Sequence, residues 1–337
     1  MSFSQPFITH RTRKDKFYTQ VNRLINWHKV DKQVKRYYKA NHGEVGRDGY
    51  EGLLLFKMLL LGIWNNLSDY GVEELVNDSL SASSFCGLSL EDDVPDHSIL
   101  SRFRTTMTKR GVFDKLLSKI NQQLEANNVM VKTVTKVDAS ITDTPRKPRG
   151  NKTFEVDDDN QAKQCYKPSV DQDASWVKKA GKTRYGFKKH IITDDEGLVI
   201  GVKTTKASVH DSQVFEELVG DANLPPSCEV QADKAYKSKR HDNYLNKHKL
   251  KNGTQHRAYR NKPLTKQQTQ HNKQVAKTRY MVERTFGSMV RWFGAGTARY
   301  VGIDKMHTQH VLESIAYNLK RMPNLMAKQI VKQGVYT

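Results

Sequence analysis

The spacing of apolar residues changes along the chain, and its first third has the period of helices. Apolar positions recur three and four residues apart over residues 50–128. The run Gly52 to Trp64 (GLLLFKMLLLGIW) has 13 residues and includes Lys57, so it is shorter than the ~20 apolar residues that span a bilayer. We therefore predict a helical domain over residues 1–128 that contains a buried core helix, and we predict no membrane span.

Two residues of this region mark the starts of helices. Ser68 and Asp96 each precede an apolar helical pattern, where a side-chain oxygen accepts hydrogen bonds from free backbone N–H groups. The helix after Asp96 carries Arg102 and Arg104, and it is a candidate for a helix-turn-helix-like DNA reader. The pattern alone favours the simpler reading, a helical bundle with solvated arginines.

From Val129 onward the alternation has a period of two, which is typical of strands. The strand-like segments are VMVKTVTKVDASI, a hairpin RYGFKKHIITDDEGLVIGVKTTKAS that turns at Asp195 to Gly197, and PPSCEVQADKAY. Helical segments follow at residues 211–219, 239–247 and 270–293. This order predicts a mixed α/β domain over residues 129–325, with helices on both faces of the sheet and a tail from residue 326 to 337.

A polar tract interrupts the α/β pattern at residues 143–182. It has few apolar residues and mixed charge, so we expect a surface insertion that is a mobile loop. The acidic run Asp157 to Asp159 lies inside it, and we expect this run to be solvated.

The charge of the chain is unevenly distributed. Lysine and arginine number 56 against 36 acidic residues, which gives a net charge of +20. Residues 1–40 carry +8 and residues 234–291 carry +14, so the rest of the chain is close to neutral. Basicity confined to two regions favours surfaces that bind a polyanion such as nucleic acid.

The sequence also argues against several classes of protein. Cys86, Cys165 and Cys228 lie 79 and 63 residues apart, which fits neither a disulfide framework nor a CxxC zinc site and favours a reducing compartment. The chain has no P-loop and no nucleophile elbow, so nucleotide hydrolysis and serine-hydrolase chemistry have no support.

Three carboxylates stand out by their position. Asp138 lies in a strand, where aspartate is rare, Asp233 ends the strand CEVQAD, and Glu283 lies on a long helix. Carboxylates at strand ends and on an adjacent helix can converge, and such oxygen ligands suit Mg²⁺ or Mn²⁺. Taken singly, each is more often a cap, turn or surface residue. Arg279, one turn before Glu283, is compatible with a simple i, i+4 ion pair.

Two further groups of polar residues have weaker patterns. His307, His310 and Glu313 have HxxHxxE spacing on a helix, but no cysteine or fourth ligand is near, so surface or interface histidines are favoured over a zinc site. Asp211 is predicted to cap the helix that follows it, and the role of His210 is left open.

Several motifs, in order, resemble a known family. The segments are VDASI, GFKKHIITDDEGLVIGVKTTKASVHDS, VQADKAYKS, TRYMVERTFGSMVRWFG and IAYNLKR. Together they resemble the DDE transposases of bacterial insertion sequences, and within that broad insertion-sequence-four/five superfamily they are most similar to the insertion-sequence-five group. The segment LSDYGVEELVNDSLSASSFCGLSLEDDVPDHSILSRFR resembles the helical domain that precedes the catalytic domain there. The resemblance covers roughly residues 45–322.

The resemblance implies a ribonuclease H-like fold and an acidic triad. The two aspartates and the glutamate of the family fall on Asp138, Asp233 and Glu283, separated by 95 and 50 residues. It implies two Mg²⁺ ions, with Mn²⁺ as a substitute, held by these three carboxylates. Two positions depart from the related Y-R-E-K signature, because Ala276 stands in place of tyrosine and Val290 in place of lysine. Contacts to DNA are expected from Arg102, Arg104, Lys234, Arg279, Arg284 and Arg291.

The function that the resemblance implies is that of a cut-and-paste transposase. It would bind the terminal inverted repeats of its mobile element, hydrolyse phosphodiester bonds at the ends and join the 3′ hydroxyl to target DNA. The expected partners are double-stranded DNA and a second copy of the chain in the DNA complex, in the bacterial cytoplasm at the nucleoid. The alternatives are a structure-specific nuclease on the same fold and a domesticated DNA-binding protein without activity. The intact triad argues against the latter.

Overall fold

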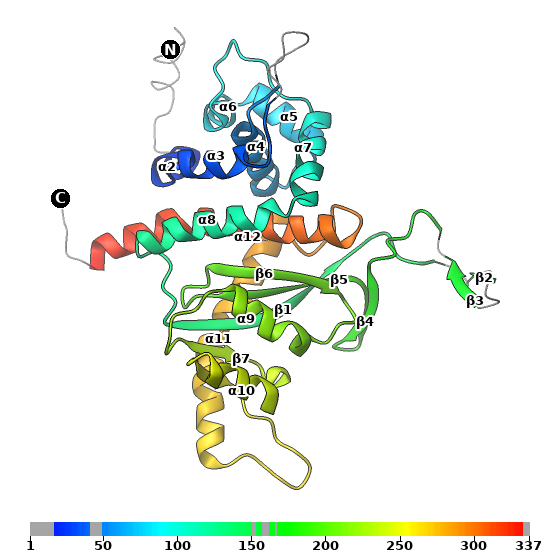
Figure 1. Ribbon diagram of the computed structural model, residues 1–337, viewed down its shortest axis with the longest axis vertical. Coiled ribbons are helices and arrows are strands. Elements are labelled where there is room, and N and C mark those ends of the chain that lie inside the picture. The colour runs from blue at the N-terminus through cyan, green and yellow to red at the C-terminus, as the bar shows by residue number, and fades with distance from the viewer. Residues whose placement is uncertain (1–16, 41–48, 150–152, 157–161, 166, 333–337) are drawn as a thin grey trace.

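A helical region and a sheet with helices on both faces make up the molecule (Figure 1). The structure, a computed structural model, describes residues 17–40, 49–149, 153–156, 162–165 and 167–332. The helical region lies above the sheet in the view of Figure 1, and α8 (Val112–Ala126) and α12 (Ile303–Lys332) cross between the two.

The helical region confirms the helices predicted from the apolar spacing. Besides α8 it comprises α2 (Phe17–Leu24), α3 (Trp27–Lys35), α4 (Gly52–Trp64), α5 (Asp69–Asp78), α6 (Leu80–Cys86) and α7 (His97–Lys109). Nearly all of α4 is buried, and Lys57 within it donates to the Phe85 carbonyl at 2.8 Å. Ser68 and Asp96 cap their helices as predicted. No helix among the described residues is long and apolar enough to cross a membrane.

The sheet has the mixed topology of ribonuclease H-like folds. Its strands are β1 (Val134–Asp143), β4 (Ser175–Lys179), β5 (Lys182–Thr193), β6 (Val199–Lys206), β7 (Glu229–Ala232) and β8 (Lys251–Thr254). Strand β1 pairs antiparallel with β5 and parallel with β7, which in turn pairs parallel with β8. Strands β4 and β6 pair with different parts of β5, so the order is β4/β6, β5, β1, β7, β8. The predicted fold class is thereby confirmed.

Helices cover both faces of this sheet. They are α8, α11 (Lys266–Phe293) and α12 on one face, and α9 (Phe215–Asp221) with α10 (Lys239–Lys247) on the other. Successive side chains of a strand point to opposite faces, and β5 shows this directly. Lys189 contacts Met289 of α11 and Glu313 of α12, whereas its neighbour Lys188 pairs with Asp211, which precedes α9.

The predicted domain boundaries do not separate independent cores. One hydrophobic cluster contains residues of the helical region, the sheet and α12. The Trp64 indole donates to the Ala316 carbonyl at 2.9 Å, and Asn121 of α8 donates to the Val199 carbonyl of β6 at 3.0 Å. The helical region and the sheet therefore share one hydrophobic core. Helix α12 continues to Lys332, so it includes the first residues of the predicted tail.

Part of the predicted mobile insertion is ordered structure. Strand β4 lies inside it and adds to the main sheet, and β2 (Thr153–Val156) pairs with β3 (Ala162–Cys165). Val170, Ala174 and Tyr185 belong to a second, smaller apolar cluster, which fixes the chain before β4. The prediction of a mobile loop is wrong for residues 167–182, because backbone pairing with β5 orders a segment with few apolar side chains. The run Asp157 to Asp159 lies outside the described residues.

His310 and Glu313 of α12 are core residues rather than surface residues, whereas His307 is half-buried and lies at an interface, with Nε2 3.0 Å from Asp114 of α8. His310 is fully buried between Thr142 (3.0 Å) and Thr204 (2.8 Å), and burial lowers its pKa well below the ordinary value, so the ring is neutral. Glu313 is also buried and pairs with Lys189. No group of three His, Cys, Asp or Glu side chains that could hold a metal occurs among the described residues. His310 and Glu313 therefore have a structural role, because each is buried and has a polar partner.

Removing one partner of the buried Lys189–Glu313 pair is expected to be costly. Glu313→Ala leaves a buried ammonium uncompensated, so the free energy of unfolding should fall by about 3–5 kcal/mol. The double variant Lys189→Met/Glu313→Leu should recover most of the loss. Glu217→Ala, which breaks the exposed Lys203–Glu217 pair (2.7 Å), should cost less than ~1 kcal/mol. Urea unfolding of the four proteins measures these differences, and a small loss for Glu313→Ala would show that water reaches Lys189.

The cap of the short helix before α9 differs from the prediction. His210, not Asp211, is the N-cap, and its ring accepts from the backbone N–H of Ser212. Asp211 lies in the first turn and pairs with Lys188 of β5 at 2.7 Å. Lys188 on the sheet binds the Asp211 carboxylate, so Asp211 does not cap the helix. The spacing of residues along the chain does not show this contact.

Candidate active site

Two of the three predicted carboxylates lie on neighbouring parallel strands, Asp138 in the middle of β1 and Asp233 directly after the end of β7. The pairing of β1 with β7 runs from Val134 and Glu229 to Val137 and Ala232. Asp138 is the next residue of β1, and Asp233 is the residue directly after β7. Because parallel strands present corresponding residues at the same edge, the register itself brings the two aspartates together.

A single arginine joins the two aspartates. Arg279 of α11 places Nη2 3.3 Å from Asp138 Oδ2 and Nη1 3.9 Å from Asp233 Oδ2. The prediction that it pairs with Glu283 along the helix is replaced by this contact across the sheet. Thr278, its neighbour, donates to Gln231 Oε1 of β7 at 2.7 Å, and this bond fixes α11 over the strand ends.

The two aspartates differ in their surroundings. Burial raises the pKa of Asp138, and Arg279 and the backbone N–H of Ala139 (2.8 Å) act in the opposite direction. Asp233 caps a short turn and accepts from the backbone N–H of Lys234. Behind them the Tyr236 hydroxyl is buried, and burial together with nearby aspartates raises its pKa well above the ordinary value. A protonated phenol therefore lies beside the carboxylates.

Glu283 lies on α11 one turn after Arg279, and its side chain is exposed. The structure does not gather it with Asp138 and Asp233 into a group of three metal-binding side chains within the described part of the chain. Its place on the same helix as Arg279 keeps it near this edge of the sheet. The role of Glu283 remains a prediction.

The donor set fits a divalent cation that prefers oxygen. Mg²⁺ is bound through one or two carboxylates, with water and phosphate oxygens completing its shell. Asp138 and Asp233 each place an Oδ2 atom near the same guanidinium, so one oxygen of each carboxylate lies close to a shared point. The contacts given for Asp138 and Asp233 within the described part of the chain involve arginine and backbone N–H groups, so the donors at this point are carboxylate oxygens.

The residues predicted to bind DNA fall into different environments. Arg102 on α7, Lys234 beside Asp233 and Arg291 in the last turn of α11 are exposed. Arg284 is half-buried and donates to the Glu196 carbonyl at 3.1 Å. The exposed three remain candidates for contacts to phosphate or base edges.

Arg104 is a structural residue, which corrects its prediction as a DNA contact. Its side chain is buried and forms a bidentate ion pair with Asp69 at 2.6 and 2.7 Å. Its guanidinium also lies over the Tyr300 ring, 4.3 Å from the centroid. The group has no free face toward solvent, because helical periodicity turns it toward α5 while Arg102 points outward.

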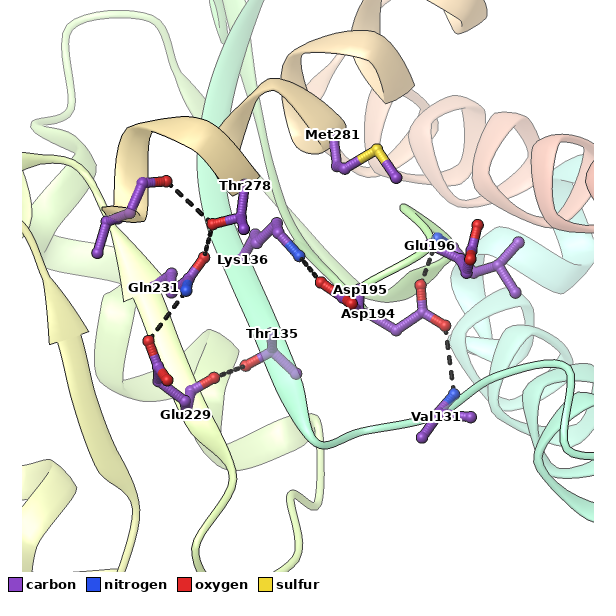
Figure 2. A network of polar contacts seen from close by, with 12 residues as sticks. Val131, Thr135, Lys136, Asp194, Asp195, Glu196, Glu229, Gln231, Thr278 and Met281 are labelled. Atoms are coloured by element: carbon purple, nitrogen blue, oxygen red, sulfur yellow. Dashed lines mark hydrogen bonds and ion pairs between the residues drawn. The ribbon is translucent and has the colours of Figure 1, made fainter. Parts of the chain in front are cut away.

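Sequence reasoning missed a polar network beneath the site (Figure 2). Lys136, two residues before Asp138 on β1, is fully buried and donates to Asp195. Asp194 accepts from the backbone N–H groups of Leu198 (2.7 Å) and Val131 (3.3 Å), and so it ties the β5–β6 turn to the start of β1. The signal was a lysine inside an apolar strand, TVTKVDASI, because a buried ammonium requires a partner for its charge.

The Asp194 carboxyl predicts a pH dependence of stability. Burial raises its pKa to about 7. A carboxyl whose folded pKa is raised stabilises the fold fully below its unfolded pKa near 4, and this contribution is lost as pH rises through about 7. Between pH 4 and pH 8 it should remove on the order of 3 kcal/mol of unfolding free energy. Asp194→Asn should flatten the pH profile in urea unfolding, and a profile identical to wild type would contradict this role.

Comparisons with known proteins agree with this geometry. Residues 130–319 match the family model Transposase DDE domain, and residues 7–106 match Transposase domain (DUF772). The chain is 34% identical over 228 residues to the transposase for insertion sequence element IS1106 of Neisseria meningitidis serogroup B, which is 67% of this chain and 78% of that protein.

Solved structures resemble the chain only distantly. The piggyBac transposase synaptic complex with hairpin DNA aligns with a TM-score of 0.44 at 12% identity, over 96% of this chain and 78% of that one. The Mos1 strand transfer complex aligns with a TM-score of 0.22 at 12% identity, over 86% and 81%. The family models and the insertion-sequence relative carry the assignment: the chain belongs to the DDE transposases of bacterial insertion sequences.

Proposed function

We propose that this transposase binds the ends of its own element, hydrolyses a phosphodiester bond at each end and joins the freed 3′ hydroxyl to target DNA. The observation that carries the proposal is that Asp138 in the middle of β1 and Asp233 at the end of the parallel strand β7 contact the same guanidinium, that of Arg279. The DDE family of the chain supplies the class of reaction.

Each residue of the site has a distinct task in this proposal. Divalent cations, when bound, activate the attacking water or hydroxyl, stabilise the leaving oxygen and shield the phosphate charge. Asp138 and Asp233 would hold the cations, and Glu283 would supply a further carboxylate oxygen from α11. Lys136 fixes β1 below Asp138 through Asp195, so the strand that carries the central carboxylate cannot shift.

A basic arm offers the DNA a path across this end of the molecule. We define the arm as residues 255–277, the loop after β8 and the first half of α11, which extends past the sheet in Figure 1. Between Asp242 and Glu283 the chain has no acidic residue. The exposed cations of the arm are Arg257, Arg260, Lys262, Lys266, Lys273 and Lys277.

The arm is preorganised for binding. Asn272 on α11 accepts from the backbone N–H of His256 (2.8 Å) and donates to its carbonyl (3.0 Å), which fixes the loop to the helix. Tyr259 and Lys262 close a tight turn through two backbone hydrogen bonds of 3.2 and 3.0 Å. Cations held in place lose less entropy on binding a polyanion than cations on a floppy loop do.

Reading of base sequence is assigned to the helical region, with Arg102 on the exposed face of α7 as the candidate. The shared core means that this region has to be tested by substitution in the whole chain. A homodimer in the DNA complex stays a prediction.

A strand-transfer assay with the full chain and Mg²⁺ tests the proposed function. The donor DNA carries the element end either intact or with its 3′ end already freed, and a supercoiled plasmid serves as target. A transposase joins both donors. Cleavage of the intact donor without joining would identify a nuclease, and binding without either reaction would identify a DNA-binding protein.

A further inference from the structure

Arg279 is nearly buried, but its contacts to the two aspartates are long. Its side chain is 12% exposed, yet its distances to Asp138 and Asp233 are 3.3 and 3.9 Å. Good charge-assisted hydrogen bonds are ~2.7–2.9 Å long. The Nε atom is also buried and has no hydrogen-bond partner among the described residues. The guanidinium is therefore held by charge rather than by well-formed hydrogen bonds.

Other arginines of the same molecule show what a structural pair looks like. Arg104 binds Asp69 through two bonds of 2.6 and 2.7 Å, and Arg184 binds Asp143 at 2.8 and 2.6 Å. Each of these guanidinium groups uses its fork on one carboxylate. Arg279 instead directs its two Nη atoms at two different carboxylates. Both of its contacts, 3.3 and 3.9 Å, are longer than those of Arg104 and Arg184.

The charge balance explains why an arginine lies there. Two carboxylates this close repel each other, and Asp138 is shielded from water by burial. One guanidinium between them offsets the repulsion without a metal. A divalent cation that binds the same oxygens would bring two positive charges to the place that Arg279 neutralises, so the two cations exclude each other.

We propose that Arg279 is an exchangeable counterion of the Asp138–Asp233 pair, which holds the site together in the absence of a divalent cation and leaves it when the cation binds. The inference rests on the proposed function, because it takes these two aspartates as the metal ligands. The displaced guanidinium remains at the site edge, where it is free to contact a DNA phosphate.

Binding of Mn²⁺ to the full chain without DNA tests the exchange. Isothermal titration calorimetry should show that Arg279→Gln binds Mn²⁺ at least about tenfold more tightly than wild type, because no guanidinium has to be displaced. In EDTA the melting temperature of Arg279→Gln should be lower than that of wild type, and Mn²⁺ should raise it by more. Mn²⁺ affinity equal to or weaker than that of wild type would overturn the proposal.

The matched control is Arg321→Gln. Arg321 is also nearly buried, with 15% of its side chain exposed, and it lies 3.8 Å from the carboxylate of Glu196, away from the site. This variant loses the same charge and should leave Mn²⁺ affinity unchanged. An equal gain in both variants would mean that net charge alone controls the affinity, and it would also overturn the proposal.

A double variant covers the case in which Arg279→Gln does not fold. Asp138→Asn removes the repulsion that Arg279 offsets, so Arg279→Gln/Asp138→Asn should melt in EDTA above Arg279→Gln alone. Failure of the proposed function has a different signature, because Asp138→Asn would then leave Mn²⁺ affinity unaffected. Loss of Mn²⁺ binding in Asp138→Asn with unchanged affinity in Arg279→Gln overturns the counterion proposal alone.

Discussion

Asp138→Asn and Asp233→Asn are each expected to abolish both end cleavage and strand transfer. The substitutions keep the size of the side chain and remove the charge that holds a divalent cation, so chemistry should fall to background. Each variant still folds, since one carboxylate remains opposite Arg279 and the strand pairing is unchanged. Gel assays with labelled element ends and Mg²⁺ measure both reactions, and retained cleavage in either variant would contradict the assignment.

Glu283→Gln is the more informative variant of the series. This substitution is also expected to abolish both reactions. In the structure the Glu283 side chain is exposed, and within the described residues it does not form a three-residue metal-binding group with Asp138 and Asp233. Binding to element ends should survive in all three variants. The control removes Asp157, Asp158 and Asp159 together and should leave cleavage intact. If this control were inactive while Glu283→Gln cut normally, the third carboxylate would have to be sought in the insertion.

The affinity for DNA is expected to fall steeply with salt. If ~6–10 phosphates are contacted, binding should weaken by ~10³–10⁵-fold between 50 and 200 mM salt, because the DNA releases condensed counterions. The two basic windows of the sequence, +8 and +14, supply the cations. Fluorescence anisotropy with a labelled element end, in EDTA, gives the slope of log affinity against log salt. An affinity that does not change with salt would contradict the inference that the two basic windows bind DNA phosphates.

The basic arm should account for part of that slope. Arg260→Gln/Lys262→Gln removes two cations at the arm's turn and should reduce the slope by about 2, at roughly 0.9 per phosphate contact. The double variant Lys305→Gln/Lys328→Gln removes the same charge from exposed positions of α12, outside the arm. It should keep the wild-type slope. Equal slopes for the two double variants would mean that the arm is not a contact surface.

Local signals in the sequence were sufficient for most elements. The alternation in TVTKVDASI, the turn after Asp194 and the caps at Ser68 and Asp96 are decided by neighbouring residues, and each was confirmed. Predictions failed where a partner that is distant in sequence determines the position or the contacts of a side chain. His210 became the cap because Lys188 holds Asp211, and Arg104 is buried because Asp69 of another helix faces it.

The boundaries failed for a related reason. Composition predicted a mobile tract at residues 143–182, but strand β4 inside it is ordered by backbone hydrogen bonds to β5, which composition does not encode. The helical and α/β regions were predicted as two domains because the spacing of their apolar residues differs. They share one core because Trp64 and Asn121 reach across to α12 and β6.

By itself, the sequence determined the fold class, the order of the elements and the regional charge, and its resemblance to a family predicted Asp138, Asp233 and Glu283 as the site. Only the tertiary structure decided that Asp138 and Asp233 lie side by side, that Arg279 lies between them rather than beside Glu283, and that Lys136 anchors the strand from below. Periodicity reports which face of an element is buried. The partner on that face depends on the packing of segments that lie about 60 to 140 residues apart. Because burying an unpaired charge costs free energy, Lys136 and Arg279 are each paired with an aspartate from such a distant segment.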